Sequence, residues 1–149
     1  MRISANSFRK FGNPSKMYGM ETINFGEHLT LDGYGGDPIL LNDKGLVERA
    51  FPELLEKLQM HALYEPIVVS APDNGLKDPG GWSGFVIIAE SHVALHTFPK
   101  RGFISADVYT CQNGLDTEAV VKYFKETFKL KDVETNFIKR GTRYPAQNL

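Results

Sequence analysis

Residues 89–99 read Ala-Glu-Ser-His-Val-Ala-Leu-His-Thr-Phe-Pro, and a second run follows from Phe103 to Cys111. In the second run Ile104, Ala106 and Val108 alternate with more polar residues, which is the period of a strand with one buried face. Residues 99–102, between the runs, have the length of a hairpin connection. The two runs therefore predict an antiparallel pair of strands over 92–98 and 103–111.

The sequence on either side predicts more strands of the same kind. Short runs of apolar and β-branched residues, bounded by Gly, Pro, Asn or Asp, indicate each of them. The additional predicted strands cover residues 23–31, 67–71, 83–89 and 133–139.

Two stretches with apolar residues at helical spacing predict helices. The first begins at Asn42 or Asp43, and Pro52 inside it predicts a kink or two shorter helices, because an interior proline costs ~3 kcal/mol. The second begins at Asp116 or Thr117. The apolar stripes are Leu46, Val47, Ala50, Phe51, Leu54, Leu55 and Leu58, and then Val120, Val121, Phe124 and Phe128. This order of elements predicts an α+β two-layer sandwich, an antiparallel sheet with two helices on one face.

Length and pattern predict one domain. The 149 residues divide into an irregular N-terminal arm over 1–22, a domain over 23–141 and a tail over 142–149. The arm mixes Ser, Asn, Arg, Lys and Gly without periodicity, which is typical of irregular chain.

Charge and cysteine content narrow the range of partners. The 17 Lys and Arg balance 18 Asp and Glu, which argues against a nucleic-acid partner bound through phosphates. No apolar run approaches the ~20 residues that span a bilayer, and the N-terminus lacks the apolar stretch of a signal peptide. The single cysteine, Cys111, fits a reducing compartment. We therefore expect a cytoplasmic protein with neither a membrane nor a nucleic-acid partner.

Five residues on and around the predicted strand over 92–98 are candidates for chemistry. His96 lies five residues after Ser91, Cys111 twenty after it and Ser83 eight before it, and Glu90 directly precedes the serine. Taken singly, each has an ordinary structural explanation: a turn serine, a hydrogen-bonded histidine, a small buried thiol. Their common placement on neighbouring predicted strands, or at the boundary between two of them, makes them candidates as a set.

A metal site built on His92 and His96 is a further possibility for the same stretch. On a helix these two rings would be neighbours, but on a strand four residues span ~13 Å. Zinc ligands lie ~2 Å from the ion, so one zinc cannot bridge them. We expect no metal.

The spacing of Ser83, Glu90, Ser91, His96 and Cys111 resembles the core of the pyruvoyl-dependent S-adenosylmethionine decarboxylases in their short prokaryotic form. The opening of the domain is similar too, in the residues Gly26, His28, Asp32, Tyr34 and Asp37. The resemblance implies a proenzyme, or zymogen, that cleaves itself between positions 90 and 91 and converts Ser91 into a pyruvoyl group. It also implies a homodimer of cleaved protomers, with sites near the interface completed by a partner loop.

The resemblance further implies a role for each residue. Ser91 Oγ attacks the carbonyl carbon of Glu90 to form an ester, and β-elimination then leaves the precursor of the pyruvoyl group. His96 takes the Ser91 α-proton, and Ser83 supports this processing. In the mature enzyme the pyruvoyl carbonyl forms a Schiff base with the substrate amine and acts as the electron sink for decarboxylation. Cys111 then donates a proton to the carbon that has lost carbon dioxide.

Two positions depart from the pattern of enzymes that act on S-adenosylmethionine. Lys100 stands where these enzymes carry an acidic residue that holds the ribose, and Lys77 stands where an aromatic residue stacks on adenine. An unmatched polar contact in a closed site costs ~1 to 3 kcal/mol, so both changes weigh against an adenosyl ligand. The interpretation of both as solvated loop residues has at least as much weight as any role in binding.

We therefore expect an amino-acid decarboxylase of polyamine biosynthesis and favour L-ornithine or L-arginine as its substrate. Its cationic side chain would need a carboxylate, for which Asp73, Asp78 and the new chain terminus at Glu90 are candidates. The first alternative is an S-adenosylmethionine decarboxylase that supplies aminopropyl groups for spermidine. The second is a non-enzymatic α+β binding module that is never processed.

Overall fold

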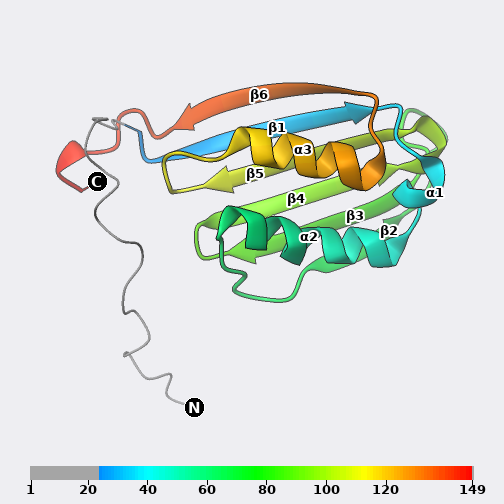
Figure 1. Cartoon of the computed structure of the whole chain (residues 1–149), viewed down its shortest axis with the longest axis horizontal. Coiled ribbons are helices and arrows are strands. Elements are labelled where there is room, and N and C mark those ends of the chain that lie inside the picture. Colours follow the sequence, from blue (N-terminus) through cyan, green and yellow to red (C-terminus); the bar gives the residue numbers. More distant parts are fainter. Residues whose placement is uncertain (1–23, 149) are drawn as a thin grey trace, which may run out of the picture.

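The computed structural model describes residues 24–148 (Figure 1). The predicted N-terminal arm, residues 1–22, lies outside the described residues, as do Ile23 and Leu149. No described helix is both long enough and apolar enough to cross a membrane.

Six strands form one antiparallel sheet in the order β2-β3-β4-β5-β1-β6. Their bounds are β1 Gly26–Tyr34, β2 Ile67–Ala71, β3 Gly81–Ile88, β4 Ser91–Phe98, β5 Phe103–Thr110 and β6 Asp132–Arg140. The central pair is β4 and β5, joined through a 3-10 turn at Pro99–Arg101. All six predicted strands are confirmed, although β1 continues to Tyr34, past the predicted strand end at residue 31.

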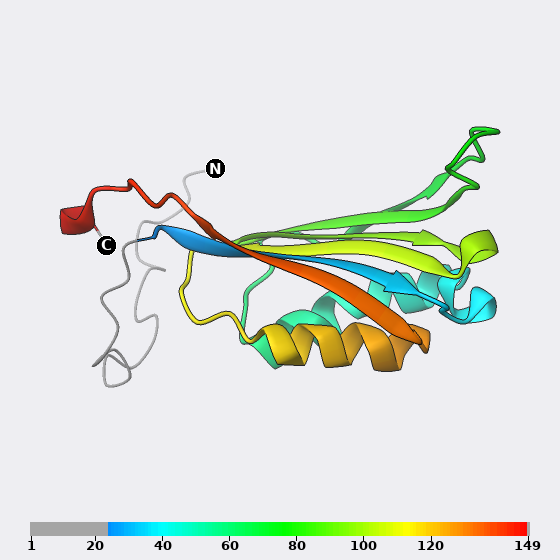
Figure 2. The same cartoon turned by 90° about the horizontal axis from the view of Figure 1, so that it is seen from above.

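The helices pack on one face of this sheet (Figure 2), which confirms the predicted α+β two-layer sandwich. They are α1 Pro38–Leu41, α2 Lys44–Leu58 and α3 Thr117–Phe128. The short α1 lies in a stretch for which no helix was predicted. Asp37 caps it by accepting from the backbone N–H groups of Ile39 and Leu40, and proline is favourable at its first position because its missing N–H would be unpaired there.

Each long helix begins at one of its two predicted caps. Asp43 caps α2 by accepting from the amide of Leu46, and Asp116 caps α3 by accepting from that of Ala119. Pro52 does not divide α2, which runs through it as one helix, so the alternative of two short helices is wrong. Pro52 removes the donor for the carbonyl of Glu48, and both residues are exposed, so that carbonyl is not left buried without a partner.

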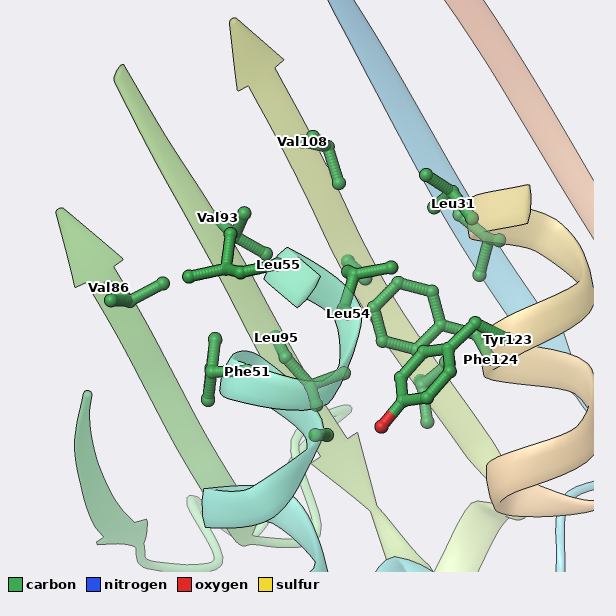
Figure 3. Close-up of a cluster of buried hydrophobic side chains, with 14 of the residues drawn as sticks. Leu31, Phe51, Leu54, Leu55, Val86, Val93, Leu95, Val108, Tyr123 and Phe124 are labelled. Atoms are coloured by element: carbon green, nitrogen blue, oxygen red, sulfur yellow. The ribbon is translucent and has the colours of Figure 1, made fainter. Parts of the chain in front are cut away.

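The core lies between the sheet and the two long helices (Figure 3). Phe51 of α2 and Phe124 of α3 are each 1% exposed. A Cβ at Gly84 of β3 would lie 2.6 Å from ring atoms of Phe51, so the glycine makes room for the ring beside Ser83. The other buried sheet residues are Leu29, Leu31, Val86, Ile88, Val93, Leu95, Ile104, Ala106 and Val108. The packing of α2 therefore fixes the strand that carries Ser83.

The opposite side of the sheet, called here the uncovered face, has no helix of the described residues on it (Figure 2). Cross-strand register places His28, His92, His96 and Asp107 there, on alternate positions from the core residues. Large apolar side chains on the same face are also exposed. They are Ile67, Val69, Phe85, Ile87 and Ile138. The four of these on the neighbouring strands β2 and β3 lie side by side, and such exposed apolar clusters are typical of interaction surfaces.

We predict that Phe51→Ala lowers the free energy of unfolding by about 3–5 kcal/mol, because it removes a buried ring and leaves a cavity. Urea denaturation at fixed protein concentration measures this loss. The control is Glu56→Ala on the exposed side of the same helix, which should change stability by less than about 0.5 kcal/mol. Equal effects of the two substitutions would contradict the described packing.

Candidate active site

Ser91 begins β4 directly after the tight connection from β3, and its backbone is in an unusual conformation. Its φ is 146°, a value that residues with a side chain rarely adopt. Backbone strain of this kind costs of the order of 1–3 kcal/mol and persists only where surrounding contacts enforce it. The contacts that enforce it here belong to Glu90 and to the end of β5.

The carbonyl oxygen of Glu90 accepts a hydrogen bond from the backbone N–H of Cys111, with an N···O distance of 2.7 Å. Ser91 pairs with Thr110 in the β4–β5 ladder, so Cys111 directly follows the residue opposite Ser91. Glu90, Ser91 and Cys111 therefore form one cluster, which we call the junction. A hydrogen-bond donor on the Glu90 carbonyl is suited to stabilise negative charge that develops there.

The side chain of Glu90 is buried, being 3% exposed as a residue. Its two carboxylate oxygens accept from one residue, His61: Oε2 from the backbone N–H at 3.1 Å, while Oε1 lies 3.0 Å from Nδ1 of the ring. Because a carboxylate only accepts, Nδ1 must carry the proton in this contact. Sequence patterns gave no signal for His61, which lies in the irregular connection between α2 and β2.

His96 and Ser83 form a second cluster, which we call the His96–Ser83 pair. The two residues face each other across β3 and β4, and Nδ1 of His96 lies 2.9 Å from Oγ of Ser83. His96 is exposed on the uncovered face. The imidazole therefore has a hydroxyl partner and an open side.

Within one protomer the junction and the His96–Ser83 pair lie apart. Five residues of β4 separate Ser91 from His96, which at about 3.3 Å per residue puts their Cα atoms roughly 16 Å apart. Each cluster thus brings together part of the predicted set. A single described chain does not bring the imidazole to the serine.

The predicted substrate contacts at Lys100 and Asp73 lie near the C-terminal end of β4, whereas Ser91 lies at its N-terminal end. Lys100 Nζ is 3.1 Å from Oδ2 of Asp73, in the loop before β3. The backbone N–H of Gly75 and the Lys100 ammonium hold the pKa of Asp73 below its usual value. Asp78 accepts from the amide of Gly80 within the same loop, and Lys77 is exposed there.

A cluster that the sequence prediction did not assemble lies on the uncovered face. Nε2 of His28 is 3.0 Å and Nε2 of His92 is 3.3 Å from Oδ2 of Asp107, and these three residues could offer metal ligands within 4.8 Å of one another. The guanidinium of Arg140, however, lies 3.0 Å from Nδ1 of His28. It donates there, so the His28 proton is on Nε2 and faces Asp107, and no lone pair is left for a cation. We assign no metal to this cluster.

A groove of about 500 Å³ lies between α3 and the β1–β6 edge, lined in part by Leu29, Val121 and Phe137. Leu29 and Phe137 are cross-strand partners on the helix side of the sheet. The groove is therefore separated by the sheet from the His96–Ser83 pair, and we do not assign it to the chemistry.

Comparisons with known proteins match most of the chain to one family. The family described as S-adenosylmethionine decarboxylase matches residues 27–141. The "S-adenosylmethionine decarboxylase proenzyme" of Pyrococcus horikoshii is 36% identical over 122 residues, which cover 82% of this chain and 81% of that protein. The proenzyme of the same name from Acetivibrio thermocellus is 33% identical over 116 residues, covering 78% and 88%.

A solved structure shares the fold. The adenosylmethionine decarboxylase from Aquifex aeolicus superposes with a TM-score of 0.67 at 22% identity, over 79% of this chain and 92% of that chain.

We predict that Ser91→Gly is more stable than Ser91→Ala by about 1 kcal/mol, because glycine adopts a φ of 146° without strain. Neither variant has a hydroxyl, so the comparison is independent of any chemistry at this residue. Ala94→Gly, in the same strand, is the control and should lower stability by about 0.5–1 kcal/mol. Urea denaturation measures the stability of all three variants. If Ser91→Gly is no more stable than Ser91→Ala, the junction is unstrained.

Proposed function

The chain belongs to the S-adenosylmethionine decarboxylase family, and we propose that it cleaves itself between Glu90 and Ser91 to become an active decarboxylase of polyamine biosynthesis. Members of this family are pyruvoyl-dependent carboxy-lyases made as proenzymes, and they form their cofactor from a serine without a metal. The family match over residues 27–141 supports a single decarboxylase domain over 23–141. Cleavage would give chains 1–90 and 91–149.

The observation that carries the proposal is the junction itself. Ser91 follows a carbonyl that already accepts a 2.7 Å hydrogen bond from Cys111, and its own backbone is strained at φ 146°. The hydrogen bond stabilises the oxyanion that forms when a nucleophile adds to the Glu90 carbonyl carbon. Breaking the peptide bond releases the strain, so both features favour cleavage at this bond.

The proposed cleavage converts the Glu90–Ser91 peptide bond into an ester and then into two chains. Ser91 Oγ bonds to the Glu90 carbonyl carbon, the bond from that carbon to the Ser91 nitrogen breaks, and the hydroxyl proton ends on the freed amine. A base then removes the Cα proton of Ser91, and the Cβ–Oγ bond breaks. Oγ leaves as part of the new C-terminal main-chain carboxylate of Glu90. The remaining dehydroalanine tautomerises to an imine, and its hydrolysis releases ammonia and leaves the pyruvoyl group.

His96 is the proposed base for the elimination, with Ser83 holding its ring. Imidazole takes up protons near neutral pH, and the bond to Ser83 orients it on the uncovered face. Because roughly 16 Å of strand separates it from Ser91 in the same chain, we propose that His96 of the partner subunit serves Ser91. Each site would then combine the junction of one protomer with the His96–Ser83 pair of the other.

The uncovered face supports a homodimer of this kind. Beside the His96–Ser83 pair it carries Val69, which is 54% exposed and pairs with Ser83, and Phe85, which is 41% exposed and lies two residues along β3 on the same face. A two-fold interface uses the same surface on both copies, so it brings two equivalent sites together at once. Burial of this apolar surface supplies the driving force for association.

In the mature enzyme the pyruvoyl group supplies the electron sink for loss of the substrate carboxylate. The chain's own contribution after that step is a proton, and Cys111 is the proposed donor. Thiols are mostly protonated near neutral pH, and Cys111 is half-buried beside Ser91. In the proposed site its Sγ–H donates to the carbon that loses carbon dioxide, a role supported by the place of Cys111 directly after the residue paired with Ser91.

We infer S-adenosylmethionine as the substrate. The two relatives described above bear its name and match about four fifths of the chain, whereas the expectation of L-ornithine or L-arginine is not confirmed. The structure also weakens the argument from Lys100, because its ammonium is engaged by Asp73 and this ion pair accounts for the lysine without any ligand. L-Ornithine or L-arginine remains the second candidate, favoured by the lysine at position 77.

We predict that cleavage can be restored by mixing two inactive chains. Ser91→Ala and His96→Ala should each remain uncut alone. In a mixed dimer, one site combines the intact Ser91 of the His96→Ala chain with the intact His96 of the Ser91→Ala chain. Co-expression with tags of different size should therefore cleave the His96→Ala chain only, as read on denaturing gels. Normal cleavage of His96→Ala alone, or none after co-expression, would contradict the shared site.

We also predict that the cleaved protein releases carbon dioxide from carboxyl-labelled S-adenosylmethionine and not from labelled L-ornithine or L-arginine. Trapped radioactivity measures each reaction, and Ser91→Ala serves as the blank because it cannot form the pyruvoyl group. Release from L-ornithine or L-arginine alone would overturn the substrate assignment while leaving the decarboxylase assignment intact.

A further inference from the structure

Glu90 is one of the few buried charged side chains of the described residues, and its carboxylate has no part in the cleavage steps above. His61 holds both of its oxygens, through the backbone N–H and through Nδ1. A single residue thus sets the orientation of the side chain next to the bond that is cut.

His61 is itself fixed to the end of β3. Its carbonyl accepts from the N–H of Ala89 at 2.8 Å, and the next residue, Ala62, forms a β-bridge with Ile88. The connection between α2 and β2 is therefore joined by backbone contacts to the residues that lead into Glu90. Glu90 is held on two sides, by His61 at its carboxylate and by Cys111 at its carbonyl.

We propose that His61 is a positioning residue for self-cleavage, acting through the carboxylate of Glu90. The proposal rests on cleavage at Glu90–Ser91. Holding the carboxylate fixes the side chain of Glu90 and, with the Cys111 contact, the plane of the peptide that Ser91 attacks. The strained φ of Ser91 needs such support, because strain persists only where neighbouring contacts enforce it.

An electrostatic effect acts in the same direction. When Ser91 Oγ adds to the Glu90 carbonyl, negative charge develops on an oxygen of the same residue that carries the buried carboxylate. Like charges at short range in a buried site repel strongly. The N–H groups of His61 bind the carboxylate and offset its charge, so the oxyanion on the backbone forms at lower cost.

The test measures the rate of cleavage of newly made chains. Full-length protein is labelled briefly during cell-free synthesis, and the uncut fraction is followed on denaturing gels, with intact mass identifying the cut. His61→Leu removes the ring donor and should slow cleavage roughly 10- to 100-fold, the cost of a small misplacement of reacting groups. His61→Asn places an amide N–H close to where Nδ1 lay and should cleave at near the wild-type rate. Glu65→Leu, exposed in the same connection, is the matched control.

Glu90→Gln separates positioning from a general loss of structure. Without the charge there is no carboxylate to hold or offset, so His61→Leu should slow Glu90→Gln far less than it slows the wild type. The same His61 variants in a Ser91→Ala background, which cannot cleave, are unfolded in urea to establish that they fold.

Four results would overturn the proposal. They are wild-type cleavage by His61→Leu, equal slowing by His61→Asn and His61→Leu, an undiminished effect of His61→Leu in Glu90→Gln, and slowing that simply follows a loss of folding. If the wild type itself is not cut at Glu90–Ser91, the proposed function fails first, and the two failures are therefore distinguishable.

Discussion

The backbone hydrogen bond from Cys111 to the carbonyl of Glu90 connects the fold to the chemistry. It exists because β4 and β5 pair in a register that sets Thr110 opposite Ser91, leaving the next amide aimed at the preceding carbonyl. The same pairing holds Ser91 in a conformation that a side chain rarely adopts. A shift of one residue in that register would move every core side chain of β4 to the uncovered face, so the packing of Val93 and Leu95 protects the junction.

The two faces of the sheet have different roles. The helix face buries Phe51 and Phe124 and fixes the strands, whereas the uncovered face presents the His96–Ser83 pair among exposed apolar side chains. One protomer therefore holds two incomplete clusters on a rigid scaffold. A second copy seated on the uncovered face would complete both sites and bury the apolar surface in the same event.

Much of this arrangement follows from the sequence because strand alternation and short connections determine register. The pairing of Ser83 with His96 follows from the tight connection at residues 89–90, and the pairing of the start of β4 with the residues before Cys111 follows from the hairpin at residues 99–102. The strain at Ser91 does not follow, because it depends on contacts from several elements at once. His61 was missed for a related reason: it lies in a connection without periodicity, and its contact to Glu90 spans 29 residues.

The substrate contacts also could not be predicted from the sequence. Lys100 is a departure from the family pattern, but only the structure sets it beside Asp73. Its simplest explanation is now an exposed ion pair, which contributes little to stability or specificity by itself.

The bond before Ser91 is tested most directly by intact-mass measurement of the denatured wild-type protein, with and without borohydride. We predict two chains that meet at residues 90 and 91, with the second lacking an amino group at its start and gaining two hydrogens on reduction. A single full-length chain, or a second chain that begins with an unmodified serine, would contradict the account.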